Sequence, residues 1–321
     1  MTDPQFQETD EVIDPELQDT INDTFDDTRP EEIVDKTVPL WRQRLNIFAQ
    51  NKLAIVSVAF LLLITLSCYL VPILHPTNQT NQAATFNVPW NQHPSWAHPL
   101  GTDSSGYDVL GRIFYGGEYS LTLGFFAGLI TIVVGTLYGM ISGFFAGVTD
   151  TIMMRLLDAM LSIPYLFLLI TLITIFNRST VFLIVIIGMT GWWANARIIR
   201  GDALLIRNLE YSQAATAMGA SKLHIIRRHV FPNSISNIVT VATFSVADAI
   251  LFLSALGFLG LGIQSPQTDW GTMLQLGSVQ FQNGYWWEVF PLATVFILVV
   301  VSINYIGDAM RDAFEVRLLE R

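Results

Sequence analysis

The sequence has few charged side chains for its length. Asp, Glu, Lys and Arg make up 14% of its 321 residues, whereas about 25% is usual in soluble domains. Hydrophobic residues account for 51%, so most of the surface cannot face water. This shortage of charge excludes an ordinary soluble globular domain and favours an integral membrane protein.

Cysteine and histidine are also scarce. The single cysteine, Cys68, lies in an apolar run and has no second cysteine with which to form an internal disulfide. The five histidines are scattered along the chain without the spacing of a metal site. No convergent Ser–His or Cys–His arrangement is visible, which argues against a membrane enzyme, and no cofactor or metal is expected in this chain.

The net charge of −10 comes from the amino-terminal region. Thirteen Asp and Glu residues lie between Asp3 and Asp35, against Arg29 alone, whereas the remainder carries fourteen acids and sixteen bases. Because large apolar residues are few here, residues 1–38 are predicted to form a disordered acidic tail. The region lacks the basic start and early apolar run of a signal peptide. A partner-binding role stays open, and a solvated tail without specific function is the simpler interpretation.

Six apolar runs can cross about 30 Å of hydrocarbon, which takes about 20 helical residues. They lie at approximately 53–73, 121–143, 156–175, 180–196, 236–262 and 288–306. The third and fourth are separated by only a few residues and are predicted to form a hairpin. The predicted fold is therefore an all-α integral membrane protein, whose six-span transmembrane domain occupies residues 53–321.

Lys and Arg residues are distributed unevenly between the predicted loops. Thirteen of them fall near the chain ends and in the loops after the second and fourth spans, whereas Arg112 and Arg178 fall on the opposite side. Because basic loops favour the cytoplasm, both termini and the basic loop 197–235 are predicted to be cytoplasmic. The loop 74–120 is then on the outside. Apolar and basic residues alternate at helical spacing in 39–52, which predicts an amphipathic elbow helix at the membrane interface.

Glycines recur at four-residue spacing in and after the second span, at Gly135, Gly139, Gly143 and Gly147. A stripe of glycines lets another helix backbone approach closely, so these residues predict a packing face. The sequence leaves open whether a neighbouring span or a second subunit packs against it.

Three charged residues, Asp150, Arg155 and Asp158, lie just before the third predicted span. Arg155 and Asp158 are three residues apart and can therefore share one helix face. Their predicted role is local structure at the cytoplasmic boundary rather than direct coupling to a partner.

The stretch EYSQAATAMGAS, residues 210–221, lies in the basic loop between two apolar segments. An acidic residue at its start and a glycine near its end predict a short helix. One face of that helix, at positions i, i+3, i+4 and i+7, carries Tyr211, Ala214, Ala215 and Met218. Such a small-faced helix fits either a groove in another protein or its own chain, and the residues alone leave both alternatives open.

Asp248 lies roughly midway along the fifth predicted span. A charge in the middle of a membrane helix is costly unless it is paired or hydrated. The functional interpretation is that Asp248 lines a translocation path. The alternative is a protonated or hydrogen-bonded contact between helices.

Four blocks, in order along the chain, together resemble one family. The basic loop resembles the coupling-loop signature of ABC-importer permeases, E-A-A, three residues, Gly, nine residues, I-x-L-P, with Ala214, Ala215, Gly219 and Pro232 in register and Gln213 in place of the glutamate. The other blocks are similar to those of dipeptide, oligopeptide and nickel permeases. They are HPLGTDSSGYDVLGRIFYGG (98–117), LGFLGLGIQSPQTDWGTML (256–274) and NYIGDAMRDAFEVRL (304–318), and the first is typical of the C-type partner of the permease pair.

The resemblance implies the type I ABC-importer permease fold, with residues 210–221 as a cytoplasmic coupling helix. The implied ATPase-coupling residues are Glu210, Tyr211, Gln213, Ala214, Ala215, Met218 and Gly219, and Asp248 is the translocation-path candidate. The implied partners are a B-type permease, two ABC ATPases, an external or periplasmic substrate-binding protein and the lipid bilayer, with no nucleic acid. The chain has no GxxxxGK[ST] motif, so ATP and Mg are expected on the partners, and this chain is not itself an enzyme.

The expected function is ATP-driven import of dipeptides or oligopeptides through a bacterial or archaeal cell membrane. Within the same family, nickel or another small solute is the alternative substrate. A different class, the ion-coupled secondary transporter, would show inverted repeats and helices broken at the midplane. The sequence shows no clear repeat, and that class leaves the coupling-loop block unexplained.

Overall fold

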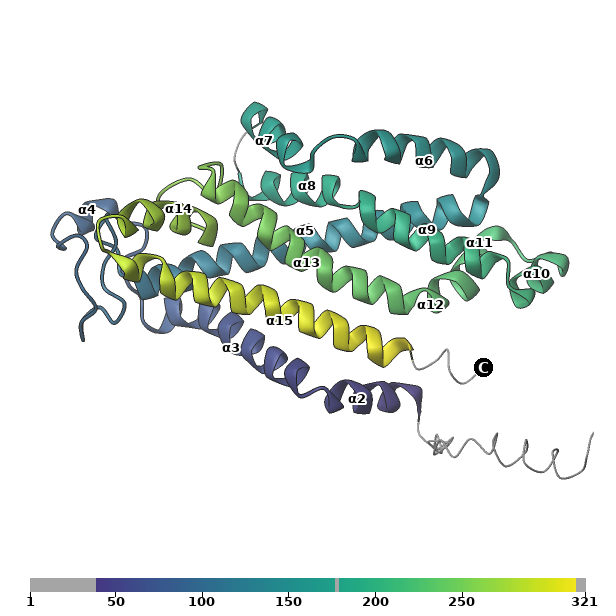
Figure 1. Ribbon diagram of the computed structural model, residues 1–321, viewed down its shortest axis with the longest axis horizontal. Coiled ribbons are helices and arrows are strands. Elements are labelled where there is room, and N and C mark those ends of the chain that lie inside the picture. The colour runs from purple at the N-terminus through teal and green to yellow at the C-terminus, as the bar shows by residue number, and fades with distance from the viewer. Residues whose placement is uncertain (1–38, 177–178, 316–321) are drawn as a thin grey trace, which may run out of the picture. The chain divides into compact units, whose positions relative to one another are not determined.

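The computed structural model describes residues 39–176 and 179–315. The chain divides into two units, Met1–Gln43 and Arg44–Arg321, and of the first unit only residues 39–43 are described. The predicted acidic tail, 1–38, lies outside the described residues, so that prediction stays untested. The regular elements of the described chain are helices (Figure 1), as the sequence predicts.

The helices begin and end as follows. They are α2 (Leu40–Gln50), α3 (Lys52–Leu74), α4 (Gln82–Thr85), α5 (Val109–Phe145), α6 (Gly147–Leu161), α7 (Tyr165–Ile175), α8 (Thr180–Gly191), α9 (Trp193–Arg207), α10 (Glu210–Ala217), α11 (Lys222–Ile225), the π-helical turn η1 (Ile226–Val230), α12 (Phe231–Asn233), α13 (Ile235–Phe258), α14 (Trp270–Phe281), the 3-10 turn η2 (Trp286–Glu288) and α15 (Phe290–Glu315). The chain thus has a helix where the elbow is expected and another where the coupling helix is expected.

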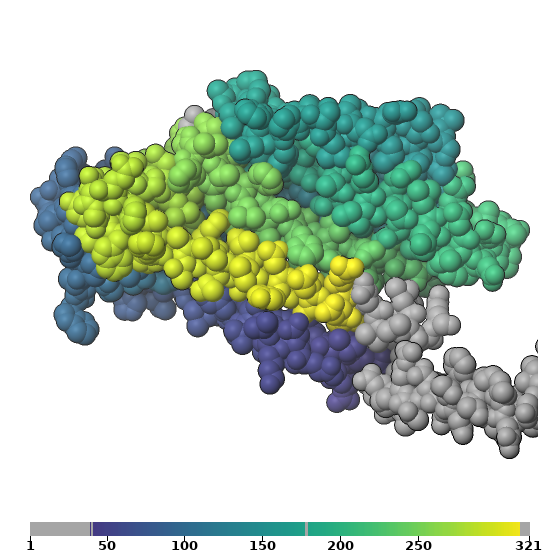
Figure 2. All heavy atoms as spheres, viewed as in Figure 1, coloured from purple at the N-terminus to yellow at the C-terminus, as the bar shows by residue number. Residues whose placement is uncertain are grey.

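Four continuous helical segments of the described chain are long and apolar enough to cross a membrane. They are Lys52–Leu74, Val109–Phe145, Ile235–Phe258 and Trp286–Phe314. These helices run alongside one another (Figure 1), with α5 and α15 both packed against α3 and α13. Figure 2 shows α15 and α3 side by side on one face.

The third and fourth predicted spans differ from the expectation because each lies within a bent pair of helices. The pair α6 and α7 bends by 79° between Leu161 and Tyr165, and the pair α8 and α9 bends by 43° at Trp192. Pro164 explains the first bend, since proline lacks a backbone N–H and disfavours a helical conformation in the residue before it. The count is six spans only if each bent pair crosses the membrane as one.

Helix α5 is longer than the second predicted span and includes residues assigned to the outer loop. Its first turns, from Val109 onward, contain several glycines. Two of these glycines allow close packing. A Cβ on Gly116 would lie 3.1 Å from Met273 Sδ, and a Cβ on Gly117 would clash with Cys68 and Trp270. The outer loop therefore ends before Val109.

The glycine stripe packs against α9, which answers the question that the sequence leaves open. A Cβ on Gly135 would lie 3.1 Å from Trp192 O, and one on Gly139 would lie 2.5 Å from Ala196 O. Gly143 meets Arg200 O in the same way, at 2.6 Å. Three glycines thus let the backbones of α5 and α9 touch. Gly147 is different, because it is the first residue of α6, has φ +59° and has nothing within 4 Å of an added Cβ.

Helix α14 is an element that the sequence patterns did not predict. It begins after Asp269, whose carboxylate is fully buried and accepts hydrogen bonds from Thr272 N (3.0 Å), Thr272 Oγ1 (2.7 Å) and Ile263 N (3.0 Å). The buried Trp270 that follows donates its indole N–H to Ile113 O of α5 at 2.9 Å. An N-terminal Asp cap followed by Thr three residues later is the signal that would have placed this helix.

Candidate functional site

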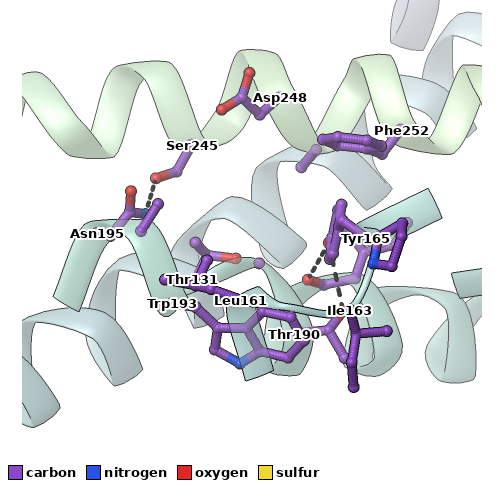
Figure 3. Close-up of a pocket in the computed structure, with 15 residues that line it drawn as sticks. Thr131, Leu161, Ile163, Tyr165, Thr190, Trp193, Asn195, Ser245, Asp248 and Phe252 are labelled. Carbon is purple, nitrogen blue, oxygen red and sulfur yellow. Dashed lines mark hydrogen bonds between the residues drawn. The ribbon is translucent and has the colours of Figure 1, made fainter. Parts of the chain in front are cut away.

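A cavity of about 330 Å³ lies between the bent helix pairs and α13. The lining comes from α5, the elbow between α6 and α7, α8, α9 and α13 (Figure 3). The residues are Thr131, Leu161, Ile163, Pro164, Tyr165, Ile187, Thr190, Gly191, Trp193, Ala194, Asn195, Ser245, Asp248, Ala249 and Phe252. Its volume falls at the low end of the range for small-molecule sites, about 300–1,000 Å³.

Most polar side chains in this cavity are held by hydrogen bonds within their own helix or to neighbouring helices. Thr131 Oγ1 donates to Gly188 O (3.2 Å), Thr190 Oγ1 donates to Ile186 O (2.6 Å), and Tyr165 Oη donates to Ile187 O (3.2 Å). Asn195 Nδ2 of α9 donates to Ser245 Oγ of α13 at 2.7 Å (Figure 3). These bonds connect α5 and α7 with α8, and α9 with α13.

Aromatic rings form the apolar part of the wall. Tyr165 lies edge-to-face against Phe252, with ring centroids 4.5 Å apart, and against Trp193 at 6.2 Å. Such ring pairs are stabilising beyond the area that they bury. The elbow between α6 and α7 is therefore fixed to α9 and α13 through one tyrosine.

Asp248 lines this cavity, as its candidacy for the translocation path requires. It lies on α13 between Ser245 and Phe252 (Figure 3). Its side chain is exposed, and no described residue forms a hydrogen bond or an ion pair with it. The alternative of a hydrogen-bonded helix contact therefore finds no partner within 39–176 and 179–315. The cavity lining contains no Lys, Arg or His.

Helix α9 joins this cavity to the predicted coupling helix. It begins at Trp193 in the cavity wall and ends at Arg207, and Asn208 and Leu209 then lead directly into α10. Gln213 Nε2 donates to Asn208 O at 3.0 Å, which ties α10 to the end of α9. Figures 1 and 2 show α10 and α11 at the end of the helix bundle opposite α4 and α14.

The ends of α10 have the geometry that the sequence predicts. Glu210 is the first residue, and the helix stops at Ala217, after which Gly219 has φ +86°. Ala220 N donates to Ala215 O at 3.0 Å, so the chain reverses tightly at the glycine. The following segment forms α11 and the π-helical turn η1 rather than one regular amphipathic helix.

The predicted face of α10 is split between the protein core and solvent. Ser212 and Ala215 are buried, and Ala215 belongs to a core cluster with Phe144, Ala203 and Ile225. Ala214 is exposed, and Met218 is 83% exposed. One side of this helix therefore packs on its own chain, and the other side is uncovered, so a fit to a groove in another protein stays a prediction.

A surface groove of about 480 Å³ runs beside α10. Its lining comes from the ends of α5 and α9 and from α10 and α11, as Phe144, Phe145, Arg207, Asn208, Ser212, Gln213, Thr216, Ala217, Ala220, Lys222 and Ile225. Lys222 Nζ lies 5.0 Å from the centroid of the Phe145 ring, within reach of a cation–π interaction. The groove combines small residues with two cationic side chains.

Two ion pairs connect α6 with α9. Asp150 accepts two hydrogen bonds from Arg200, at 2.5 and 2.6 Å, and a third from Ser142 Oγ at 2.6 Å. Asp158 pairs with Arg197 at 2.5 Å. The sequence suggested that Asp158 shares a helix face with Arg155, but the pairing runs between helices because Arg197 of α9 lies opposite α6. Arg197 and Arg200 are functional candidates that the sequence reasoning did not single out.

Among the described residues, no group of three or more His, Cys, Asp or Glu side chains is arranged to hold a metal ion. The cavity and the α10 surface are the candidate sites that contain the residues predicted from the sequence. Helix α9 connects the two: its start lines the cavity, and its end leads into α10, which has an uncovered side.

Comparison with known proteins covers nearly all of the chain. Residues 114–320 match the family described as binding-protein-dependent transport system inner membrane component, and residues 39–94 match the N-terminal TM domain of oligopeptide transport permease C. The dipeptide transport system permease protein DppC of Bacillus subtilis is 36% identical over 282 residues, 88% of this chain and 86% of that protein. The oligopeptide transport system permease protein OppC of Escherichia coli K12 is 38% identical over 278 residues, 86% of this chain and 91% of that protein. The glutathione transport system permease protein GsiD of Pectobacterium atrosepticum is 32% identical over 287 residues, 89% and 94% respectively.

Proposed function

Because this chain belongs to the family of binding-protein-dependent transport system inner membrane components, and is a permease subunit related to those of dipeptide and oligopeptide importers, we propose that its two candidate sites have different roles in transport. The cavity beside Asp248 is this subunit's part of the peptide path. The exposed side of α10 is the surface that receives the motion of a partner ATPase. The observation that carries the proposal is the continuity of α9 from Trp193 in the cavity wall to the start of α10.

The reported relatives favour a peptide over nickel as the substrate, since their names specify dipeptides, oligopeptides and glutathione. A family of binding-protein-dependent permeases also argues against an ion-coupled secondary transporter. The wider assembly that we infer has a B-type permease, two ATPases and an external substrate-binding protein. In that assembly ATP and Mg are held by the ATPases, and this chain contributes transport rather than hydrolysis.

The inferred orientation places α10 and both termini in the cytoplasm of a bacterial or archaeal cell. The loop between α3 and α5 then faces outward, where the binding protein delivers the peptide. Closure of the two ATPases would push α10, and α9 would carry that displacement to the cavity wall. This is a rigid-body change between two packed arrangements, of the kind that couples distant sites in many proteins.

Replacement of the exposed residues of α10 tests the proposal directly. Ala214→Trp places a large ring on the uncovered side, and Met218→Asp places a charge there, so both should reduce binding of the ATPases by about tenfold or more while the permease stays folded. The readout is the amount of ATPase that co-purifies with the permease from its native membrane. Ala217→Ser is the matched mild change on the same helix.

Ala215 distinguishes this surface from the core. Ala215→Trp would disrupt the cluster with Phe144 and Ile225 and lower the yield of folded permease. The proposed coupling role fails if Ala214→Trp and Met218→Asp retain normal amounts of ATPase and normal uptake. It also fails if the purified chain transports substrate without any ATPase.

A further inference from the structure

The cavity carries an unusual balance of charge. Asp248 is its only acidic side chain, and no basic side chain lines it among the described residues. The other polar side chains, of Thr131, Tyr165, Thr190, Asn195 and Ser245, already donate hydrogen bonds to oxygens of their own or neighbouring helices. A carboxylate without a protein partner midway along a membrane helix is costly unless it is hydrated, protonated or paired with a cation, so Asp248 favours a cationic group in the cavity.

The surroundings of Asp248 match an organic cation better than a metal ion. A divalent metal needs several oxygen, nitrogen or sulfur ligands, and no second carboxylate, imidazole or thiol lines this cavity. Aromatic rings are present instead, because Phe252 lies one turn along α13 and Tyr165 packs edge-to-face against it. Ring faces attract ammonium groups, and a carboxylate supplies the charge-assisted hydrogen bonds that an ammonium donates.

We propose that Asp248 makes this permease half selective for peptides that carry an ammonium group on a side chain, with the lysine side chain of a peptide bound between Asp248 and the Tyr165–Phe252 pair. The inference rests on the proposed peptide path. The volume of about 330 Å³ takes one end or one side chain of a peptide rather than a whole oligopeptide. The site thus acts on one charged group as the peptide passes.

Uptake by the complete importer in liposomes, with its second permease, ATPases and binding protein, tests this selectivity. The probes are three tripeptides of net charge +1, 0 and −1, namely Ala-Lys-Ala, Ala-Ala-Ala and Ala-Glu-Ala, and the affinity of the binding protein for each is measured separately. Asp248→Asn should reduce the ratio of Ala-Lys-Ala to Ala-Glu-Ala uptake by about tenfold, which corresponds to about 1.4 kcal/mol. Asp248→Glu keeps the charge and should preserve the ratio.

Asp312→Asn is the matched control, since Asp312 is an exposed acid on α15 outside the cavity lining. Equal loss of all three tripeptides in Asp248→Asn, with the ratio unchanged, would overturn the selectivity and leave a structural role. An unchanged ratio at normal uptake would overturn it as well. If Asp248→Asn fails to assemble, the test uses Asp248→Glu alone. The proposal is then overturned if this variant prefers Ala-Lys-Ala over Ala-Glu-Ala no more strongly than the binding protein does. Failure of the unaltered importer to take up any tripeptide would contradict the proposed function instead.

Discussion

At the scale of single residues, glycine decides how closely α5 and α9 approach. Gly139 lies against Ala196 O and Arg200 N, at 2.5 and 3.0 Å from the position of an added Cβ. Gly201 of α9 has nothing within 4 Å of that position. Gly139 is therefore required for close packing of two helices, whereas no neighbour requires a glycine at position 201.

Substitution at these two positions should have opposite effects. Gly139→Ala forces the helices apart and is expected to cost about 1–3 kcal/mol of stability through overpacking. Gly201→Ala meets open space and should be neutral or stabilising by up to about 1 kcal/mol, because alanine is the better helix former. Thermal unfolding of the purified permease in detergent measures both. Equal midpoints for the two variants would contradict the close contact between α5 and α9.

At the scale of helices, the connection between α6 and α9 links the two candidate sites. Asp150 and Arg200 join the start of α6 to α9, and the far end of α6 leads through Pro164 to the cavity wall. Side chains of this pair are 14% and 28% exposed, whereas Asp158 and Arg197 are both 53% exposed. The more buried pair, with its two hydrogen bonds and a third from Ser142, should contribute more to the connection.

Loss of the Asp150–Arg200 pair should uncouple ATP hydrolysis from transport. Asp150→Asn is expected to lower peptide uptake severalfold at an unchanged rate of hydrolysis, because the displacement of α9 would no longer reach the elbow before α7. Asp158→Asn is the control and should change uptake by less than twofold. The ratio of peptide transported to ATP hydrolysed in liposomes measures this, and equal effects of the two variants would remove the proposed link.

At the scale of the whole molecule, orientation in the membrane is the main expectation still to be measured. Cys68 is the only cysteine and is fully buried, so the unaltered chain should react little with thiol reagents. Trp96 is fully exposed in the loop before α5, and Met218 is exposed beside α10. Helix α4, in the same loop as Trp96, and helix α10 lie at opposite ends of the bundle in Figure 1.

Labelling of intact cells with a membrane-impermeant maleimide should separate the two ends. Trp96→Cys is expected to react when the reagent can reach the outer face of this membrane. Met218→Cys should react only after the membrane is permeabilised. The unaltered chain controls for Cys68. The opposite pattern would invert the orientation, and reaction of both variants from one side would contradict a crossing between them.

The sequence predicted the helical class, the four continuous spans and the ends of α10, because each depends on local composition. Runs of apolar residues identify α3 and α13, and a positive φ at Gly219 follows from its place after a short helix. The sequence did not predict the bends of the α6–α7 and α8–α9 pairs or the length of α5. Those depend on packing between distant segments, such as Gly117 against Trp270.

The cavity was predictable only through Asp248, the one residue whose charge conflicts with its apolar neighbours. Asn195 and Ser245 lie 50 residues apart and meet only when α9 and α13 pack together. The split of α10 has the same cause, because the burial of Ala215 is decided by Phe144 and Ile225 rather than by the helix itself. Periodicity identifies a face, and tertiary contacts decide what covers it.

The bonds of Arg112 have a consequence for how the protein is made. Its guanidinium is buried and donates to Gln79 O (2.7 Å) and to Pro266 O (3.0 Å), which lies 154 residues later in the chain. At about 5–20 residues per second, a ribosome needs roughly 8–30 s to make that interval. During that time the guanidinium of Arg112 lacks its second carbonyl partner, Pro266 O. The hydrogen bonds of this buried cation are therefore completed only late in synthesis, when the segment before α14 has been made.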